Sequence, residues 1–413
     1  MNTDVTSLAR RAADAVNLKR VATLTQELVR IRSVVEPGTG GSEQGVALYI
    51  ANVLRELGLE PTLEEVIPGR PNLICDWHGS TFNPKEHKTL MFEGHTDVVT
   101  EGDGSSWRYP PFEAQLVNGR IYGRGSCDMK AGIAAAICAL GAVMRVAPDL
   151  GGRIRLGFVI DEEGMMIGIK HFISQGWAQE IDGAIVCEPE ENELCLFQKG
   201  AMRVSVEVTG VMAHGAMPYA GVNPISALAE VVRRVEELER LEQSRLGKHP
   251  HLGLSWFTPT ILKAPTSGEA QLNVMPERAS LALDIRTLPG QDHDDLLTQL
   301  REIAAEVSQK ESRLSVTVDC FESRPATQTP EDDPLVQAME QAYPLALQTS
   351  PRYGGVPGAT DGTFLHLAGV PIVTVGPGGR TIPHQRDEFV EVEEVLKAAK
   401  LYAASAITFL SAN

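Results

Sequence analysis

Apolar and polar positions follow two patterns along this chain, and the first covers both of its ends. Short apolar runs alternate there with longer segments of helical periodicity. Helices are predicted over Thr23–Arg32, Gly45–Leu57 and the Ala-rich, buried segment Ile133–Ala147. Short strands are predicted at Thr89–Phe92, Ile154–Ile160, Ala184–Cys187 and Pro371–Val375. Strands that alternate with helices predict an α/β domain with a central, mostly parallel sheet flanked by helices.

The middle of the chain shows the second pattern, in which apolar and polar residues alternate one by one. This alternation predicts strands with one face on a core and the other in water. The expected elements are strands around Val206, Leu283 and Val316, a less regular strand at Leu254–Leu262, and helices at Pro224–Leu246 and Asp292–Glu311. The resulting order of strand, helix, two strands, helix and strand predicts a ferredoxin-like α+β unit.

The length agrees with this division, because 413 residues suffice for two to three structural units at roughly 150 residues each. We expect the ferredoxin-like unit at residues 200–322. It would be inserted between the two parts of the α/β domain, at residues 1–199 and 323–413.

Composition restricts the partners and the compartment. The chain has 54 acidic and 37 basic residues, a net charge of −17, which disfavours nucleic acid and anionic membranes as partners. The N-terminal segment lacks the apolar core of a signal peptide, and no apolar run reaches the roughly 18 residues of a membrane span. The six cysteines show no CxxC spacing. These features predict a protein of the reducing cytoplasm.

Side chains that can bind metal follow several of the predicted strands. In an open α/β sheet, ligand sites collect beyond the carboxyl ends of the strands, so side chains that follow neighbouring strands would meet in one crevice. Asp128 lies in a glycine-containing turn shortly before the Ala-rich helix. The side chains that follow strands are His95 and Asp97, then Glu162 and Glu163, then Glu188, and finally His384 after a glycine-rich turn.

Each of these residues alone has an ordinary explanation. A single histidine at a strand end is most often a surface residue, Asp128 alone is most often a helix cap, and adjacent glutamates are most often solvated. Their joint occurrence next to apolar runs favours a metal site instead. Two imidazoles and several carboxylates suit zinc, manganese or cobalt, and two such ions can lie about 3.5–4 Å apart.

The adjacent glutamates offer two roles, because neighbouring side chains on an extended backbone diverge. One of Glu162 and Glu163 would bind metal, and the other would take the proton of a bridging water. Other hydrolytic or phosphate-binding chemistry is disfavoured, since the sequence contains no HExxH, GxSxG or GxxxxGK[ST] motif.

With these motifs in order, the sequence resembles the M20 family of metallopeptidases and deacylases over nearly its whole length. The motifs that carry the resemblance are Gly94-His95-Thr96-Asp97-Val98-Val99, Trp107 with Pro111-Phe112, Tyr122-Gly123-Arg124-Gly125 with Asp128-Met129-Lys130, Asp161-Glu162-Glu163, Glu188-Pro189 and His384. The resemblance implies two divalent metal ions, of which zinc is the first expectation and cobalt or manganese the alternatives.

The resemblance also implies a role for each residue of the cluster. His95 and Glu188 would bind one metal, Glu163 and His384 the other, and Asp128 would bridge the two. Glu162 would be the general base. Asp97 would accept a hydrogen bond from the His95 ring and fix its tautomer, a role that the chemistry requires independently.

The inserted unit resembles the family's lid, which also forms the dimer interface. His214, in Gly210–Pro218, matches the histidine that reaches the active site of the other subunit and would stabilise an oxyanion there; its alternative is an ordinary loop histidine. Asn273 and Arg286 match substrate-binding positions of the lid, and Arg286 would hold a carboxylate. Its alternative is a surface pair with Asp284.

Two further positions, Gly358 and Thr360, resemble the loop that lines the family's substrate pocket, although helix capping is an equal alternative for Thr360. Met165 and Met166 depart from the family, which often has a small pair there. They would either make the pocket more apolar or pack under the sheet. Glu188, where some branches have Asp, favours the deacylases.

The function implied is a two-metal amidohydrolase that cleaves an N-acyl amino acid, as a deacetylase or desuccinylase does. The nucleophile would be the water that bridges the metals, and Glu162 its base. A dipeptidase or carboxypeptidase of the same family is the first alternative, with a short peptide as substrate. A metal-binding homodimer without hydrolytic activity is the second, and the intact set of ligands with Glu162 argues against it.

Overall fold

The computed structural model of the chain describes residues 3–35 and 43–412, which group into two compact units. Unit 1 comprises Met1–Leu196, Thr329–Gly354 and Thr360–Asn413. Unit 2 comprises Phe197–Gln328 and Gly355–Ala359. Over the described ranges, no helix has both the length and the apolar character needed to cross a membrane.

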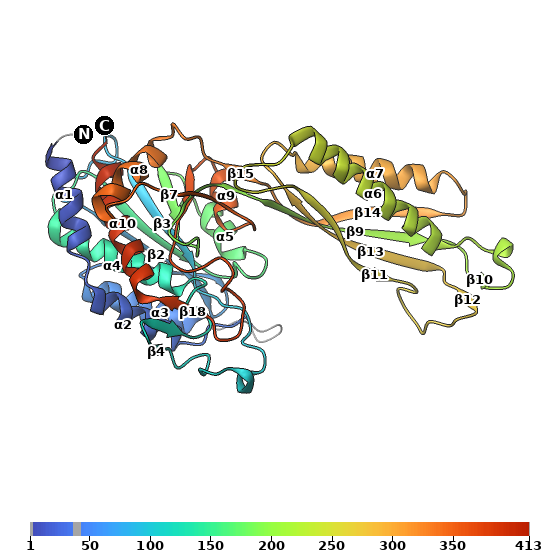
Figure 1. Cartoon of the computed structure of the whole chain (residues 1–413), viewed down its shortest axis with the longest axis horizontal. Helices are drawn as coiled ribbons and strands as arrows, with labels where there is room; N and C mark the ends of the chain where they lie inside the picture. Colours follow the sequence, from blue (N-terminus) through green and yellow to red (C-terminus); the bar gives the residue numbers. More distant parts are fainter. Residues whose placement is uncertain (1–2, 36–42, 413) are drawn as a thin grey trace. The chain divides into compact units, whose positions relative to one another are not determined.

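A mixed sheet forms the centre of unit 1 (Figure 1), with its strands in the order β1-β2-β6-β3-β7-β17-β8. The strands are β1 (Thr62–Ile67), β2 (Arg70–His78), β3 (Thr89–His95), β6 (Arg153–Val159), β7 (Gly183–Val186), β8 (Leu194–Gln198) and β17 (Ile372–Thr374). The central strands β6, β3, β7 and β17 are parallel. At the edges, β1, β2 and β8 pair antiparallel. The predicted α/β fold with a parallel centre is confirmed, with antiparallel strands added at its edges.

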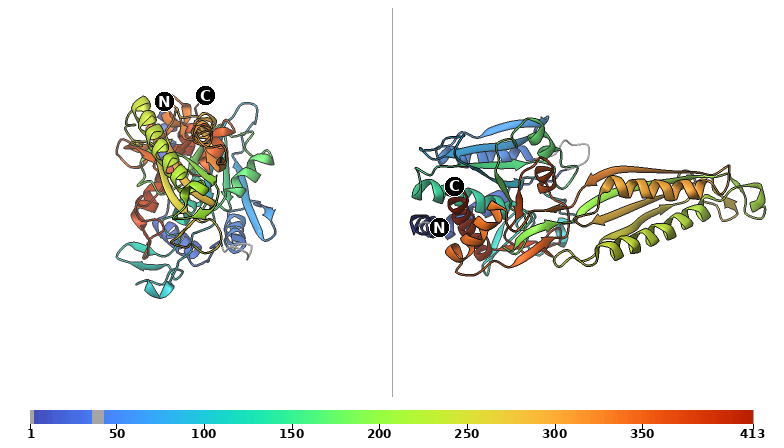
Figure 2. Two further views of the ribbon diagram at one scale, coloured as in Figure 1. Left: turned by 90° about the vertical axis from the view of Figure 1, so that its right-hand side faces the viewer. Right: turned by 90° about the horizontal axis from the view of Figure 1, so that it is seen from above.

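Helices cover both faces of this sheet, as Figures 1 and 2 show. On one face α4 and α10 pack against β3, where the rings of Phe92 and Tyr402 lie 5.2 Å apart. On the other face, Met91 of β3 shares a buried cluster with Ile169 of α5 and Leu365 of α9. The helices of unit 1 are α1 (Thr3–Asp14), α2 (Leu18–Val29), α3 (Glu43–Glu56), α4 (Lys130–Val146), α5 (Ile167–Ser174), α8 (Pro334–Ala346), α9 (Gly362–Leu367), α10 (Val392–Leu410) and the 3-10 helix η1 (Gly104–Ser106).

The three helices predicted for the first part of the chain are present as α2, α3 and α4, with shifted ends. Helix α2 begins five residues earlier than predicted, because the side chain of Asn17 caps it and accepts a hydrogen bond from the Arg20 N–H at 3.0 Å. Helix α4 is buried along almost its whole length. That burial agrees with its Ala-rich, nearly uncharged sequence, which suits close packing against β3 and β6.

A small sheet of unit 1 connects two segments that lie far apart in the sequence. Its order is β18-β5-β4, formed by β4 (Gln115–Val117), β5 (Arg120–Tyr122) and β18 (Phe389–Glu391), and all pairings are antiparallel. The strand pair β5–β18 therefore brings the turn that carries Asp128 close to the segment that follows His384.

Unit 2 contains an antiparallel sheet in the order β11-β13-β9-β14. Along the chain its elements are β9 (Gly200–Thr209), β10 (Ala213–His214), η2 (Pro218–Ala220), α6 (Pro224–Leu246), β11 (Trp256–Lys263), β12 (Val274–Met275), β13 (Arg278–Thr287), α7 (His293–Ser308) and β14 (Ser315–Arg324). The short strand β15 (Thr327–Gln328) pairs with the end of β8, as does β16 (Tyr353–Val356). This order of elements agrees with the predicted ferredoxin-like topology.

One face of the unit 2 sheet is apolar and the other polar. Alternate residues of β9, such as Val204 and Val206, join Leu281 and Leu283 of β13 in a buried cluster. Helices α6 and α7 cover that face, side by side (Figure 2). Both helices begin at a capping side chain, Asn223 for α6 and Asp292 for α7.

Candidate active site

The predicted metal-binding residues of unit 1 lie beyond the carboxyl ends of its parallel strands. His95 ends β3, Glu162 and Glu163 follow β6, Glu188 follows β7, and His384 lies in the loop after β17. Asp128 lies two residues ahead of α4, which packs against β3 and β6. Because these strands are parallel neighbours, the side chains share one edge of the sheet.

Asp128 joins the two histidines of this cluster. Its Oδ1 lies 3.0 Å from Nε2 of His95, and its Oδ2 lies 3.4 Å from Nε2 of His384. Glu188 Oε1 lies 3.5 Å from the same nitrogen of His95, and Glu163 Oε1 lies 2.8 Å from that of His384. The cluster therefore has two halves, each with one imidazole and one glutamate, and one aspartate that reaches both.

Glu162 lies on the His95 side of the cluster. Ligand atoms of His95, Glu162 and Glu188 all lie within 4.8 Å of one another, as do those of His95, Asp128 and Glu163. The adjacent glutamates thus take different places, as their divergence on the backbone predicts. The site can place one carboxylate beside each half while Asp128 remains shared.

Asp97 supports both His95 and the two glutamates. The Nδ1 atom of His95 lies 3.0 Å from the backbone oxygen of Asp97 and 3.6 Å from its carboxylate. That carboxylate accepts hydrogen bonds from the backbone N–H groups of Glu162 at 3.2 Å and Glu163 at 3.1 Å. Asp97 is fully buried, and burial opposes its ionisation, yet the His95 ring and the backbone donors keep its pKa low.

The charge states of the cluster follow from burial and mutual contact. Burial raises the pKa values of Glu162, Glu163 and Glu188. Hydrogen bonds with Asp128 and Glu163 raise the pKa of His384 to about 10. Burial opposes the charge on His95, but Asp128 and Asp97 outweigh it and raise its pKa well above the usual range. Without metal, protons therefore balance the clustered carboxylates.

This donor set fits divalent metal ions. Imidazole nitrogens and carboxylate oxygens are ligands that zinc, cobalt and manganese accept, and the arrangement in two halves with one shared carboxylate can hold two such ions. A cation in either half would replace the protons that the histidines hold without metal.

Two buried arginine clusters beside the site were not predicted from the sequence. Arg124 forms an ion pair with Glu388, and both are buried. Arg70 pairs with Glu43 and, at 2.9 Å, with Asp161, whose side chain also accepts from the Met165 N–H. The second cluster holds the turn that carries Glu162 and Glu163. Only Arg124 and Asp161 lay within motifs that the sequence analysis singled out; the spacing of their partners gave no signal.

The other predicted residues lie mostly in unit 2. His214 is exposed on β10, and its Nδ1 accepts a hydrogen bond from the Ala216 N–H at 3.0 Å. Asn273 lies just before β12, which pairs with β10, and its backbone oxygen accepts from the Gly215 N–H at 2.7 Å. His214 and Asn273 are thus neighbours within unit 2.

Arg286 of β13 makes the ion pair with Asp284 that was its alternative, with Nε to Oδ1 at 2.7 Å. Gly358 belongs to the short segment Gly355–Ala359 grouped with unit 2. Thr360 belongs to unit 1, where it is buried and its hydroxyl accepts from the Gly362 N–H at 3.2 Å at the start of α9. This contact forms a local turn at the start of α9, whose N-cap residue is Asp361.

The two methionines after the glutamate pair differ in their surroundings: one packs under the sheet, and the other is exposed. Met166 is fully buried and joins the apolar cluster beneath α5. Met165 is 50% exposed. Only Met165 is therefore available to a ligand on this side of the turn.

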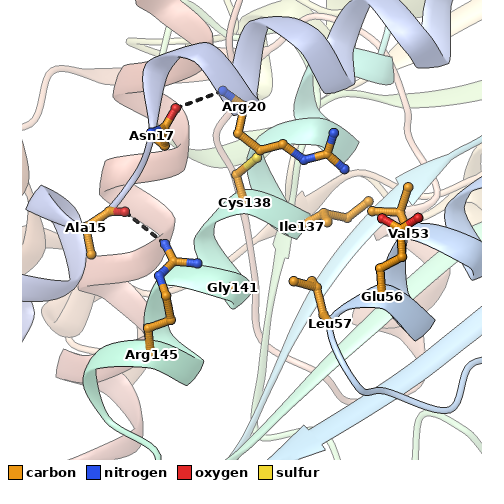
Figure 3. A pocket seen from close by; sticks show the side chains of 10 residues that line it. All are labelled: Ala15, Asn17, Arg20, Val53, Glu56, Leu57, Ile137, Cys138, Gly141 and Arg145. Carbon is orange, nitrogen blue, oxygen red and sulfur yellow. Dashed lines mark hydrogen bonds between the residues drawn. The ribbon is translucent and has the colours of Figure 1, made fainter.

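A separate cavity of about 550 Å³ lies elsewhere in unit 1 (Figure 3). None of the predicted site residues lines it. Its lining residues come from the α1–α2 loop and from helices α2, α3 and α4: Ala15, Asn17, Arg20, Val53, Glu56, Leu57, Ile137, Cys138, Gly141 and Arg145.

Comparisons with known proteins show which family the chain belongs to. Residues 91–408 match the model of peptidase family M20/M25/M40. Succinyl-diaminopimelate desuccinylase of Cereibacter sphaeroides is 30% identical over 390 residues, which cover 92% of this chain and 96% of that protein.

Solved structures also share the fold. The aminopeptidase PepT of Bacillus cereus superimposes with a TM-score of 0.78 at 18% identity, over 96% of this chain and 99% of the other. The YXEP protein of Bacillus subtilis, a dinuclear metal binding peptidase from the M20 family, gives 0.71 at 15% identity, over 95% and 98%. The family match and the desuccinylase together show that this chain belongs to peptidase family M20/M25/M40 and is a hydrolase of amide bonds.

Proposed function

We propose that the protein is a two-metal amidohydrolase that removes the acyl group from an N-acyl amino acid. The observation that carries the proposal is the contact of Asp128 with both His95 and His384, at 3.0 and 3.4 Å. A carboxylate between two imidazoles, with one more glutamate beside each, supports two neighbouring cations. The similarity to a succinyl-diaminopimelate desuccinylase supports the deacylase activity.

In this proposal His95 and Glu188 hold one ion, Glu163 and His384 hold the other, and Asp128 serves both. When bound, the ions would polarise the substrate carbonyl and lower the pKa of the attacking water. Zinc is the proposed metal because it accepts this mixture of nitrogen and oxygen ligands, and cobalt or manganese would replace it.

Glu162 takes the proton of the attacking water and then gives it to the leaving amine. Its place beside His95 and Glu188 supports this role, as does the burial that, together with nearby carboxylates, raises its pKa above that of an ordinary carboxyl. Asp97 keeps the base in place, since its carboxylate accepts from the Glu162 backbone N–H. The carboxylates that bind metal would offset the charge of the ions, and Glu162 would transfer the proton.

For the inserted unit we propose a lid that also forms a homodimer, with functional boundaries near residues 200 and 322. His214 would stabilise the oxyanion in the active site of the partner subunit. Arg286 would exchange its partner Asp284 for the substrate carboxylate, with Asn273 and Gly358 beside the substrate. Thr360 would support the pocket through its turn contact with Gly362. The cytoplasm is the proposed compartment.

The experiment that tests this function is a substrate panel assayed with metal-free protein and with zinc-, cobalt- and manganese-loaded protein. N-succinyl and N-acetyl amino acids are compared with dipeptides of the same amino acids. The proposal expects metal-dependent release of the amino acid from an N-acyl substrate. Faster cleavage of dipeptides would assign a dipeptidase instead, and substrate binding without any turnover would indicate a binding protein.

A further inference from the structure

Arg124 and Glu388 connect two segments of unit 1 that each carry a proposed metal ligand. Arg124 lies two residues beyond β5, and Glu388 immediately precedes β18, its antiparallel partner. The backbone continues this pairing, because the Gly123 N–H donates to the backbone oxygen of Glu388 at 2.8 Å. Both side chains are buried, with 3% and 0% of their surface exposed. A charged pair so deeply buried requires several polar contacts.

Glu388 makes those contacts with the segment of Asp128. Its Oε1 accepts hydrogen bonds from the backbone N–H groups of Cys127 at 2.9 Å and Asp128 at 3.2 Å. Its Oε2 accepts from Nη1 of Arg124. The carboxylate of Glu388 thereby fixes the backbone from which the Asp128 side chain extends, and a displacement there would move the oxygens that contact both histidines.

Arg124 makes the corresponding contact with His384. Its Nη2 donates to the His384 backbone oxygen at 3.2 Å, and the Trp107 ring lies 5.2 Å from the guanidinium carbon. His384 needs such support, because its side chain is 52% exposed and its backbone adopts a left-handed conformation with φ of 65°. Because the ring is half exposed, side-chain packing contributes little to keeping it beside Glu163 and Asp128.

We propose that Arg124 and Glu388 form a positioning clamp that holds Asp128 and His384 at the separation required for the second metal ion. The inference rests on the proposed two-metal function. It assigns no chemistry to either residue, since both act through the backbones of the ligands. Loss of the clamp would therefore lower the affinity for the ion held by Glu163 and His384 more than the affinity for the ion held by His95 and Glu188.

A matched control exists on the same two strands. Arg120 of β5 faces Glu391 of β18, and their side chains form an ion pair at 2.9 Å. This pair is exposed, with 43% and 49% of its side-chain surface accessible. Its arginine donates to Glu391 and lies over the ring of Phe389, at 4.3 Å from the ring centre. Arg120→Gln removes an arginine–glutamate link between β5 and β18 without touching the backbone of a proposed ligand.

The test loads the full-length chain with Co²⁺ and measures the ions bound per chain, their affinities by chelator competition, and the visible absorption of bound cobalt. The variants are Arg124→Gln, Glu388→Gln and Arg120→Gln. We expect Arg124→Gln to weaken binding of the ion held by Glu163 and His384 by about 10- to 100-fold, and Glu388→Gln to weaken that ion and, through the shared Asp128, the other ion as well. Both variants should change the cobalt spectrum. Arg120→Gln should keep both ions and the wild-type spectrum.

A double variant separates positioning from a general loss of stability. If Arg124 acts through His384, Arg124→Gln should weaken Co²⁺ binding no further when His384→Ala is already present. Should Arg124→Gln fail to fold, Arg124→Lys keeps the charge beside Glu388 but cannot also reach the His384 oxygen, and the same loss of one ion is expected. Wild-type affinities and spectra in the variants that fold would overturn the clamp. A wild-type chain that binds no Co²⁺ would overturn the proposed function, and the clamp with it.

Discussion

The candidate residues of unit 1 and those of unit 2 stand in opposite surroundings. In unit 1, His95 lies 3.0 Å from Asp128 and 3.5 Å from Glu188, and the buried carboxylate of Glu388 accepts from the backbone N–H of Asp128. In unit 2, His214 and Asn273 are exposed, and Arg286 is paired with Asp284 two residues away. The first group is organised before any ligand arrives, whereas the second makes only local contacts, such as the pairing of Arg286 with Asp284, which a substrate or another chain would have to replace.

Two histidines make the same contrast quantitative. His95 is buried among carboxylates, which raise its pKa, whereas His293 of unit 2 lies between the hydroxyls of Thr287 and Ser323, at 2.8 Å from each. Burial outweighs the charges of the neighbouring Asp292 and Asp294 and lowers the pKa of His293 to about 4. Burial alone therefore does not mark a metal site; the charges around the imidazole do.

The largest expected effect comes from Glu162→Gln. The substitution keeps the shape of the side chain but removes its ability to take a proton, so kcat should fall by about 10²–10⁴-fold while both metal ions stay bound. Steady-state rates and metal analysis of the same sample check this. Glu86→Gln, at an exposed glutamate of unit 1, is the control and should leave kcat unchanged. A Glu162→Gln variant with near-parental turnover would remove Glu162 from the base role.

His214→Ala tests whether the exposed group of unit 2 takes part in the chemistry. Loss of an oxyanion donor should lower kcat by about 10²–10³-fold and leave the bound metal unchanged, because no ligand is altered. Mixing this variant with Glu162→Gln shows whether the His214 that serves a site comes from the same subunit or from the partner subunit. If His214 serves the partner subunit, an equimolar mixture with free subunit exchange regains about a quarter of the wild-type activity, since about half of the dimers are mixed and one of the two sites in each mixed dimer is complete. No recovery on mixing, or a fully active monomer, would contradict a role across subunits.

Arg286→Gln should affect binding more than turnover. Removing a charge-assisted contact costs about 1.5–3 kcal/mol, which corresponds to a KM raised roughly 10- to 100-fold for a substrate with a free carboxylate. The matching amide substrate should show the same KM with both proteins. Equal KM values for the carboxylate substrate would leave Arg286 as a structural partner of Asp284.

The smallest expected effect on activity belongs to His293→Gln, which tests a buried histidine outside the cluster. The unfolded chain binds this proton with an ordinary pKa near 6.5 and the folded chain with a pKa of about 4. The free energy of unfolding is therefore not reduced by His293 above pH 6.5. It falls by on the order of 2 kcal/mol as the pH falls to 4, because the unfolded chain then binds the proton more readily than the folded chain. Thermal unfolding from pH 4 to 7.5 should show a weaker acid dependence in the variant, with unchanged activity at pH 7.5. Parallel curves would refute the assignment.

The sequence was sufficient to predict the central strands of each unit and the clustering of the metal-binding side chains at one edge of a sheet. Buried parallel strands appear as apolar runs, so the residues that follow them, such as His95 and Glu188, could be placed at one sheet edge. The strict alternation around Val206 and Leu283 likewise predicted the sheet of unit 2. In both cases a periodic pattern along the chain reports directly on burial.

The edges and the supporting contacts left no such pattern. The antiparallel strand β2 begins with Arg70-Pro71 and ends in mixed polar residues, and the strands of the small sheet are three residues long. Glu388 lies in a stretch of charged residues that resembles a solvated loop. Its partner Arg124 is 264 positions away, and only the folded backbone brings the two together.

The central claim is that the cluster around Asp128 binds two ions that hydrolysis requires. The most direct test is a titration of the metal-free chain with Zn²⁺, in which bound zinc and hydrolysis of an N-acyl amino acid are measured on the same samples. The account predicts binding that saturates at two ions per chain and activity that appears as the sites fill. Full activity in the metal-free chain, or saturation with fewer than two ions, would contradict it.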